Sequence, residues 1–208
     1  ACSVHLAMKG HSVWAGVRDQ KSFDEILRLN VRGLRPIQLD ITDSKSVEDA
    51  LSTIKKQAGL LNALVNNAGI VVAGPFEGVS IEAWQRQFDV NVIGQVRLTQ
   101  ACLPLLRQAK GRIVNISSIS GRLASPFLAP YAASKFALEA ISDSLRRELF
   151  KHGVHVSVIE PGPIATPIWQ KSREVEKKQK YSPEVQEVYG HTMEKFRRYL
   201  DQSEREGD

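Results

Sequence analysis

The sequence predicts an α/β protein, a doubly wound parallel sheet of the Rossmann type in three α/β/α layers, built as a single domain over residues 1–208. Two observations support this prediction. Short runs rich in β-branched residues alternate with longer segments of helical periodicity, the pattern of a parallel sheet covered by helices. Polar clusters also follow the predicted strands, where sheets of this kind bind their ligands. A chain of 208 residues with 42% hydrophobic residues suits one domain with one core.

Five short apolar runs are predicted to form the strands of the sheet. They span residues 11–17, 35–41, 61–67, 111–117 and 154–160. Each run is bounded by turn-forming or charged residues, and each is short enough for a buried strand. No internal repeat and no low-complexity linker divides them, so the five runs belong to one sheet.

Helical periodicity fills the longer segments between the strands. The clearest case is 43–59, which Asp43 or Ser44 can cap, and where apolar residues recur at helical spacing until Gly59 ends the helix. Two long helices are predicted over 80–110 and 131–150. The chain opens in a short helix that stops at Gly10, and its last residues form an amphipathic helix that ends in a charged tail.

Composition excludes several other classes of function. The net charge of +5 is not clustered, and residues 171–208 carry nine basic and nine acidic side chains, so no nucleic-acid partner is expected. Cys2 and Cys102 stand far apart and suggest no disulfide framework. The five histidines lack metal-ligand spacing, so no metal is expected. No apolar run reaches the ~18 residues of a membrane helix, and no signal peptide is recognised, which favours the cytoplasm.

Tyr131 and Lys135 form the first candidate site. Residues four apart share one face of a helix, and a cation beside a phenol favours the phenolate and lowers the tyrosine pKa. Tyr131 is therefore a candidate proton donor or acceptor. One such pair arises easily by chance. However, polar clusters also follow the five strands, at 18–19, 40–41, 66–69, 117–118 and 161–166, and a parallel sheet brings these strand ends together.

Five motifs in this order resemble those of the short-chain dehydrogenase/reductase family. They are NNAG at 66–69, NVIG at 91–94, NISS at 115–118, YAASK at 131–135 and PGPIAT at 161–166. Ser118 lies 13 residues before Tyr131, the family's usual interval. The segments WAGVRD and SISGRLASPFLAPYAASKFALEAISDSLRREL are similar to the hydroxysteroid and retinol dehydrogenase branch of that family.

The resemblance implies a catalytic tetrad of Asn91, Ser118, Tyr131 and Lys135. Tyr131 would exchange a proton with the substrate oxygen while a hydride moves between a nicotinamide and the carbonyl carbon. Ser118 would orient that oxygen. Lys135 would lower the tyrosine pKa and hold the nicotinamide ribose, and Asn91 would hold a water beside the lysine. A kink or cap within its helix is the other interpretation of Asn91.

The same resemblance implies a set of cofactor-binding residues at the strand ends. They are Arg18, Asp40, Ile41, Asn67, Ala68, Gly69, Tyr131, Lys135, Pro161, Gly162, Ile164 and Thr166. Arg18 stands where the 2′-oxygen of the adenosine ribose would lie, and a guanidinium there suits a 2′-phosphate, so NADP(H) is favoured over NAD(H). Arg18 could instead be a plain surface arginine, and the adjacent Asp19 could reverse the preference.

Substrate and partners follow from the resemblance in outline. It implies a small alcohol or ketone, preferably lipophilic, under a lid formed by helices within 167–208. Trp169, Phe127 and Leu123 could line an apolar cleft or simply pack against the core. The helices at 80–110 and 131–150 are those with which the family pairs its subunits, so a homodimer or homotetramer is expected.

The family's first strand and its glycine-rich T-G-x-x-x-G-I-G loop have no counterpart in this sequence, and neither has its closing strand. That strand lies at the centre of the family's sheet, so its neighbours would lack ladder hydrogen bonds. We therefore expect a domain that is incomplete at both ends, taken from a longer reductase of about 250 to 280 residues. The alternatives are a truncated, non-catalytic paralogue or dimerisation partner, and a sugar-nucleotide epimerase or dehydratase, which shares the Tyr-x-x-x-Lys pair.

Overall fold

Five parallel strands form the centre of the molecule in the computed structural model, which describes residues 1–162, 164, 168–169, 172 and 181–206. The strands in these ranges are β1 (Val13–Val17), β2 (Leu34–Gln38), β3 (Ala63–Asn66), β4 (Arg112–Ile116) and β5 (His155–Ile159). All five fall within the runs predicted from the sequence or within one residue of them. Their lengths of four to five residues lie within the usual range for strands of globular proteins.

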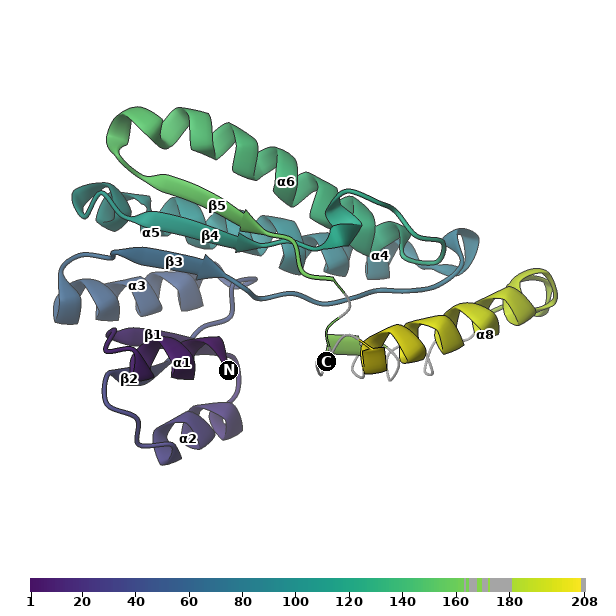
Figure 1. Ribbon diagram of the computed structural model, residues 1–208, viewed down its shortest axis with the longest axis horizontal. Coiled ribbons are helices and arrows are strands. Elements are labelled where there is room, and N and C mark those ends of the chain that lie inside the picture. The colour runs from purple at the N-terminus through teal and green to yellow at the C-terminus, as the bar shows by residue number, and fades with distance from the viewer. Residues whose placement is uncertain (163, 165–167, 170–171, 173–180, 207–208) are drawn as a thin grey trace.

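Helices connect the strands and cover them (Figure 1). The α-helices in the described ranges are α1 (Cys2–Met8), α2 (Gln20–Arg28), α3 (Ser44–Ala58), α4 (Ile81–Phe88), α5 (Gln95–Gln108), α6 (Ala129–Leu149) and α8 (Pro183–Glu206). A π-helix, η2 (Asp89–Gly94), joins α4 to α5, and the short 3₁₀-helices are η1 (Phe76–Gly78), η3 (Ile119–Gly121) and η4 (Phe150–His152). No helix in the described part of the chain has both the length and the apolar character that crossing a bilayer requires.

The predicted caps of α3 are confirmed, whereas α2 was missed. The Asp43 side chain accepts a hydrogen bond from the Lys45 amide at the start of α3, and Gly59 ends the helix at φ 73°. α2 begins in the same way, with Asp19 accepting from the Ser22 amide. The signal was present in the sequence and was overlooked: Phe23, Ile26 and Leu27 recur at helical spacing after the Asp19 cap, although none of the residues of α2 is buried.

The strands form two separate parallel sheets instead of one. β1 pairs with β2, and β3, β4 and β5 pair in that order. No ladder in the described ranges joins β1 to β3, so the single doubly wound sheet predicted from the sequence is interrupted between these two strands. The interruption agrees with the expectation that one central strand has no counterpart in this chain.

Packing by α3 and α5 joins the two sheets. One buried cluster contains Ile37 of β2, Ile54 of α3 and Leu105 of α5. A second, larger cluster contains Leu64 of β3 and Ile113 of β4, and the partly buried side chains Leu39, Leu51 and Leu61 pack against both clusters. The apolar core is therefore continuous even though the hydrogen-bonded ladder is not.

A π-helical turn interrupts the long helix predicted over 80–110. Gly94, the last residue of η2, lies so close to Ile41 that a Cβ added to it would stand 2.8 Å from the Ile41 Cγ1 atom. Arg97 of α5 donates a hydrogen bond to the Ile41 carbonyl at 2.7 Å. These contacts place the chain after β2 beside η2, where Asn91 lies.

Candidate active site

Tyr131 and Lys135 lie at the beginning of α6, next to the carboxyl end of β4. Pro130 stands in the first turn of this helix, where its missing N–H costs nothing. Both side chains are buried, at 6% and 5% exposure. The Lys135 ammonium donates to the carbonyl of Ile116, the last residue of β4, at 2.8 Å, and its Nζ atom lies 5.7 Å from the centre of the Tyr131 ring. The sheet therefore fixes the position of the lysine beside the phenol.

Ser118 follows β4 and faces the same phenol. Its hydroxyl accepts a hydrogen bond from the Ser120 amide, which starts η3, and a hydrogen bond between Ser118 and Tyr131 lowers the pKa of the phenol. The Ile119 amide donates to the Pro161 carbonyl at 3.0 Å, so the segment after β5 lies against η3. The structure thus brings Ser118, Tyr131, Lys135 and Pro161 together.

The pKa of Tyr131 differs in direction from the sequence-based expectation. Burial raises it above its usual range, and this effect exceeds the lowering by Ser118. The net lowering of this pKa expected from the sequence is therefore not found, because burial outweighs the groups that favour the phenolate. Burial also lowers the pKa of Lys135 to about 8, and the Glu139 carboxylate opposes that change. At neutral pH the site holds a protonated phenol beside a lysine that is still mostly an ammonium.

Asn91 is fully buried in η2, and its amide is engaged at both ends. Its Oδ1 accepts from the Ile70 amide at 2.8 Å, and its Nδ2 donates to the Ile70 carbonyl and to the Ser134 hydroxyl. Ser134 immediately precedes Lys135 on α6. Asn91 therefore holds the chain after β3 against the helix of the candidate site, and π-helical turns of this kind often occur at functional sites.

Two further amides on the same helical run were missed by the sequence analysis. Gln87, which is fully buried, accepts from the Val72 amide at 2.7 Å and donates to the Ile70 carbonyl. Gln95 donates to the Ala68 carbonyl at 2.8 Å. Together with Asn91 these side chains form a row at every fourth residue, so a search for polar residues at helical spacing would have found them.

The residues predicted to hold the adenosine end of a cofactor lie after β1 and β2. Asp40 accepts hydrogen bonds from the amide and the hydroxyl of Thr42, and these bonds, with a smaller effect of the nearby Arg18 charge, hold the pKa of its carboxyl below the usual range. Arg18 is exposed. Asp19 accepts from the amide and the hydroxyl of Ser22 and serves as the N-cap of α2. Ile41 is 6% exposed and belongs to the core.

The remaining predicted cofactor residues lie after β3 and β5. Asn67 and Ala68 are exposed and Gly69 is half-buried; a Cβ on Gly69 would stand 3.5 Å from the Asn91 Oδ1 atom. Pro161 is half-buried, whereas Gly162 and Ile164 are exposed. Thr166 lies outside the described residues, as does part of the lid predicted over 167–208.

Apolar side chains cover the free side of the Tyr131 ring. The Trp169 ring meets it edge-on at 6.0 Å between centroids. Val71 and Leu128 are buried with Tyr131, and Phe196 of α8 packs against this cluster. Phe127 contacts Phe196 and Tyr189, so it packs beneath α8. Leu123 is 71% exposed and takes no part in this cluster. α8 lies on the side to which the carboxyl ends of β3 and β5 point (Figure 1).

The residues present suit the nicotinamide end and the adenosine end of a nicotinamide dinucleotide. Lys135, a buried ammonium beside a phenol, can donate to ribose hydroxyls, and Arg18 and Asp40 offer a charged donor and an acceptor at the other end. Within the described ranges no glycine-rich turn leads from a strand into a helix to receive the phosphates. The first turn of α2 is already capped by Asp19. The described residues contain no group of three or more His, Cys, Asp or Glu side chains that could hold a metal ion.

Sequence comparison relates the chain to known dehydrogenases. The profile of the short chain dehydrogenase family matches residues 1–177. The chain is 44% identical over 181 residues to the mitochondrial D-beta-hydroxybutyrate dehydrogenase of Mus musculus, covering 81% of this chain and 52% of that protein. It is 43% identical over 182 residues to the NADPH-dependent 3-dehydrocapnine reductase of Ornithobacterium rhinotracheale, covering 83% and 63%. It is also 41% identical over 170 residues to retinol dehydrogenase 5 of Homo sapiens, covering 80% and 53%.

Structural comparison agrees with the sequence matches. A short-chain dehydrogenase from Streptomyces avermitilis superposes with a TM-score of 0.76 at 29% identity, covering 92% of this chain and 71% of that one. The chain spans about half to three-fifths of the length of the curated relatives it matches. The predicted Rossmann-type fold and the resemblance to the retinol dehydrogenase branch are both confirmed.

Proposed function

The chain belongs to the short-chain dehydrogenase family, and from that premise we propose that it is an oxidoreductase acting on a carbonyl or a secondary alcohol. The observation that supports this most directly is the group formed by Ser118, Tyr131 and Lys135 at the carboxyl end of β4. A bound nicotinamide cofactor would supply or accept the hydride. The protein's own side chains would then manage the proton and the charge on the substrate oxygen.

Each side chain of the group has a role that its surroundings support. Tyr131 is protonated at neutral pH, so its hydroxyl can donate a proton to an oxygen that gains negative charge. Ser118 would donate a second hydrogen bond to the same oxygen and orient it. Lys135 would stabilise the phenolate that remains and would hold the ribose hydroxyls. Asn91 would keep the chain after β3 in place beside them, through its bonds to Ile70.

Turnover tests this proposal directly. We expect the protein to oxidise NADPH, followed by the loss of absorbance at 340 nm, when it is offered lipophilic ketones or retinal. Trp169 and the apolar cluster around Tyr131 favour such substrates, and one relative is a retinol dehydrogenase by name. Faster turnover of acetoacetate would favour a small acidic substrate instead. The lipophilic proposal would then be wrong.

We propose NADP(H) as the preferred cofactor. Arg18 is exposed at the end of β1, and Asp19, the acid beside it, is engaged as the cap of α2. A guanidinium in that place can bind a 2′-phosphate bidentately, whereas an engaged carboxylate is less available to a 2′-hydroxyl. The relative named as an NADPH-dependent reductase agrees with this preference.

Replacing Arg18 tests the cofactor preference. Arg18→Gln should weaken NADPH binding by about tenfold or more, since a charged hydrogen bond contributes roughly 1.5–3 kcal/mol, and should leave NADH binding nearly unchanged. Fluorescence titration measures both affinities. Arg28→Gln, in the exposed last turn of α2, is the matched control and should change neither. A parallel loss for both cofactors in Arg18→Gln would remove the argument for NADP(H).

A non-catalytic paralogue or dimerisation partner remains the second candidate function, because one observation favours it. The ladder is broken between β1 and β3, and the described residues offer no glycine-rich turn for the phosphates. Without such a turn, tight dinucleotide binding would depend only on the residues that contact the adenosine end and the nicotinamide end of the cofactor. Cofactor binding by the chain separates the two candidates.

Subunit pairing is proposed through α5 and α6, as the sequence analysis expects. Support comes from a hollow between these helices, partly lined by Val96, Leu103, Ile141 and Leu145, which reaches the buried Asn66 and Asn115 of the sheet. Light scattering coupled to size exclusion should show a dimer or a tetramer, and a monomer at micromolar concentration would contradict the pairing.

A cytoplasmic location also stays a proposal; the composition favours it, whereas the mouse relative is mitochondrial by name.

A further inference from the structure

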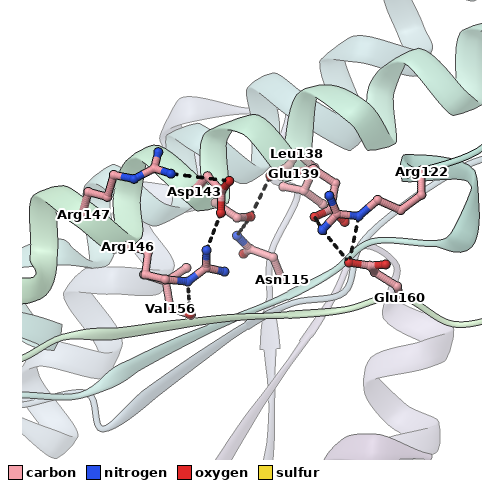
Figure 2. A network of polar contacts seen from close by, with 10 residues as sticks. Asn115, Arg122, Leu138, Glu139, Asp143, Arg146, Arg147, Val156 and Glu160 are labelled. Carbon is pink, nitrogen blue, oxygen red and sulfur yellow. Dashed lines mark hydrogen bonds and ion pairs between the residues drawn. The ribbon is translucent and has the colours of Figure 1, made fainter.

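A cluster of three charged side chains links the segments that carry the candidate active site (Figure 2). Arg122, directly after η3, lies 3.2 Å from the Glu139 carboxylate of α6 and 2.9 Å from the Glu160 carboxylate that follows β5. The Arg122 Nε atom also donates to Glu160 at 3.2 Å. The three elements joined in this way contribute Ser118, Lys135 and Pro161, respectively.

Glu139 is the buried member of this cluster. Its side chain is only 11% exposed, compared with 64% for Arg122 and 33% for Glu160. The proposed mechanism gives it no task, and its Oε1 atom is buried without a hydrogen-bond partner. Burying a carboxylate is costly unless a charge or hydrogen bonds compensate it, so its position calls for an explanation.

Gly121 allows η3 to approach Glu139 closely. A Cβ added to Gly121 would stand 3.1 Å from the Glu139 Cγ atom and 2.8 Å from the Ser117 hydroxyl. The backbone of residues 117–122, the Ser118 segment, therefore packs directly on the Glu139 side chain. The ion pair between the exposed Arg122 and Glu139 joins the same two parts of the chain. Any displacement of Glu139 would be transmitted to η3 and to Ser118.

Glu139 also lies one helical turn beyond Lys135 on the same helix. Burial lowers the pKa of Lys135 to about 8, and the Glu139 carboxylate acts in the opposite direction. The other charged groups near this part of α6 are Arg122, Glu160 and, one turn further along α6, Asp143, which is paired with Arg146 and acts on Arg122. α4 and η2 present to it the neutral amides of Gln87 and Asn91. Tyr131, on α6 itself, is protonated.

We propose, on the basis of the function proposed above, that Glu139 is a positioning residue of the active site. Through Arg122 it holds the Ser118 segment and the segment after β5 on α6, and it places a negative charge one turn from the Lys135 ammonium. Glu139 itself touches neither substrate nor cofactor. It acts through the two side chains that do, Ser118 and Lys135.

Nuclear magnetic resonance of the lysine side chain tests the electrostatic part on the full chain. The ¹⁵Nζ signal of Lys135, assigned with Lys135→Met, should titrate near pH 8. In Glu139→Gln the midpoint should fall by about 0.5–1 pH unit, because a negative charge near the ammonium is lost. Glu139→Asp should restore most of the shift. Glu148→Gln, on the exposed face of α6, is the matched control and should leave the midpoint unchanged.

Amide hydrogen exchange tests the mechanical part. Arg122→Gln should speed exchange of residues 117–122 by about tenfold, because the tie to α6 is lost while the fold persists. The Lys135 midpoint should not fall in this variant, since the Glu139 charge remains. Arg147→Gln, which removes another exposed arginine ion pair on α6, should leave exchange at 117–122 unchanged.

Two results would overturn the proposal: an unchanged Lys135 midpoint in a folded Glu139→Gln, or unchanged exchange at 117–122 in Arg122→Gln. Arg122→Gln still tests the positioning role of Glu139 if Glu139→Gln does not fold. Neither readout needs turnover or cofactor. Failure of the oxidoreductase proposal would appear instead as a wild-type chain that neither binds nor oxidises NADPH.

Discussion

We expect Tyr131→Phe to abolish turnover and to leave the affinity for NADPH within a few-fold of the original protein. This is the largest effect expected of a single substitution, because the phenol hydroxyl is the proton donor of the proposed reaction and phenylalanine removes that atom alone. General acid–base catalysis contributes typically 10²–10⁴-fold, so kcat should fall by at least ~10²-fold. Steady-state kinetics and a fluorescence titration measure the two quantities.

Tyr199→Phe is the matched control for this substitution. Tyr199 is 65% exposed on α8, and its hydroxyl has no role in the proposed chemistry, so its loss should change kcat little. If Tyr131→Phe kept most of its kcat, the acid/base role of Tyr131 would be wrong. If it instead lost turnover together with cofactor affinity or folding, the role of the hydroxyl would be structural.

Asn91→Ala should destabilise the protein by about 2–3 kcal/mol. The substitution leaves the Ile70 amide without its acceptor, and an unsatisfied buried donor costs roughly 1–3 kcal/mol in addition to the lost packing. The Ile70 carbonyl keeps the hydrogen bond from Gln87, which limits the loss. Urea unfolding, followed by circular dichroism, gives the change in the free energy of unfolding.

Gln85→Ala provides the comparison, because Gln85 is an exposed amide on the same helical run. It should change the free energy of unfolding by less than about 0.5 kcal/mol. Equal effects of the two substitutions would show that the buried amide row does not hold the chain after β3. In an active protein, Asn91→Ala should also lower kcat, since residues 67–70 and Ser134 would lose their mutual contact.

Local sequence signals predicted much of the fold. The caps of α3 are an acid before the helix and a glycine after it, and both act over a few residues, so a single stretch of sequence contains all the information needed. The strands were found for a similar reason, because buried parallel strands read as short apolar runs. α2 carries a comparable local signal, an acid before the helix and Phe23, Ile26 and Leu27 at helical spacing, and the sequence analysis overlooked it.

Features that depend on distant contacts were not predictable in the same way. The π-turn η2 follows from amides that bind a chain some twenty residues away. Desolvation decides the direction of the Tyr131 pKa, and it became visible only once Trp169 and Leu128 were seen to cover the ring. Glu139 looks like any helical glutamate in the sequence, and only the structure shows that it is buried against Gly121.

Titration of the 208-residue chain with NADPH and then with NADH, followed by fluorescence, tests the central claim most directly. The claim is that the side chains gathered after β1, β2, β4 and β5 form a site for a nicotinamide dinucleotide. The account predicts saturable binding of NADPH at micromolar concentration, weaker binding of NADH, and a selective loss for NADPH in Arg18→Gln. Binding of neither cofactor would contradict it and would favour a non-catalytic role for the chain.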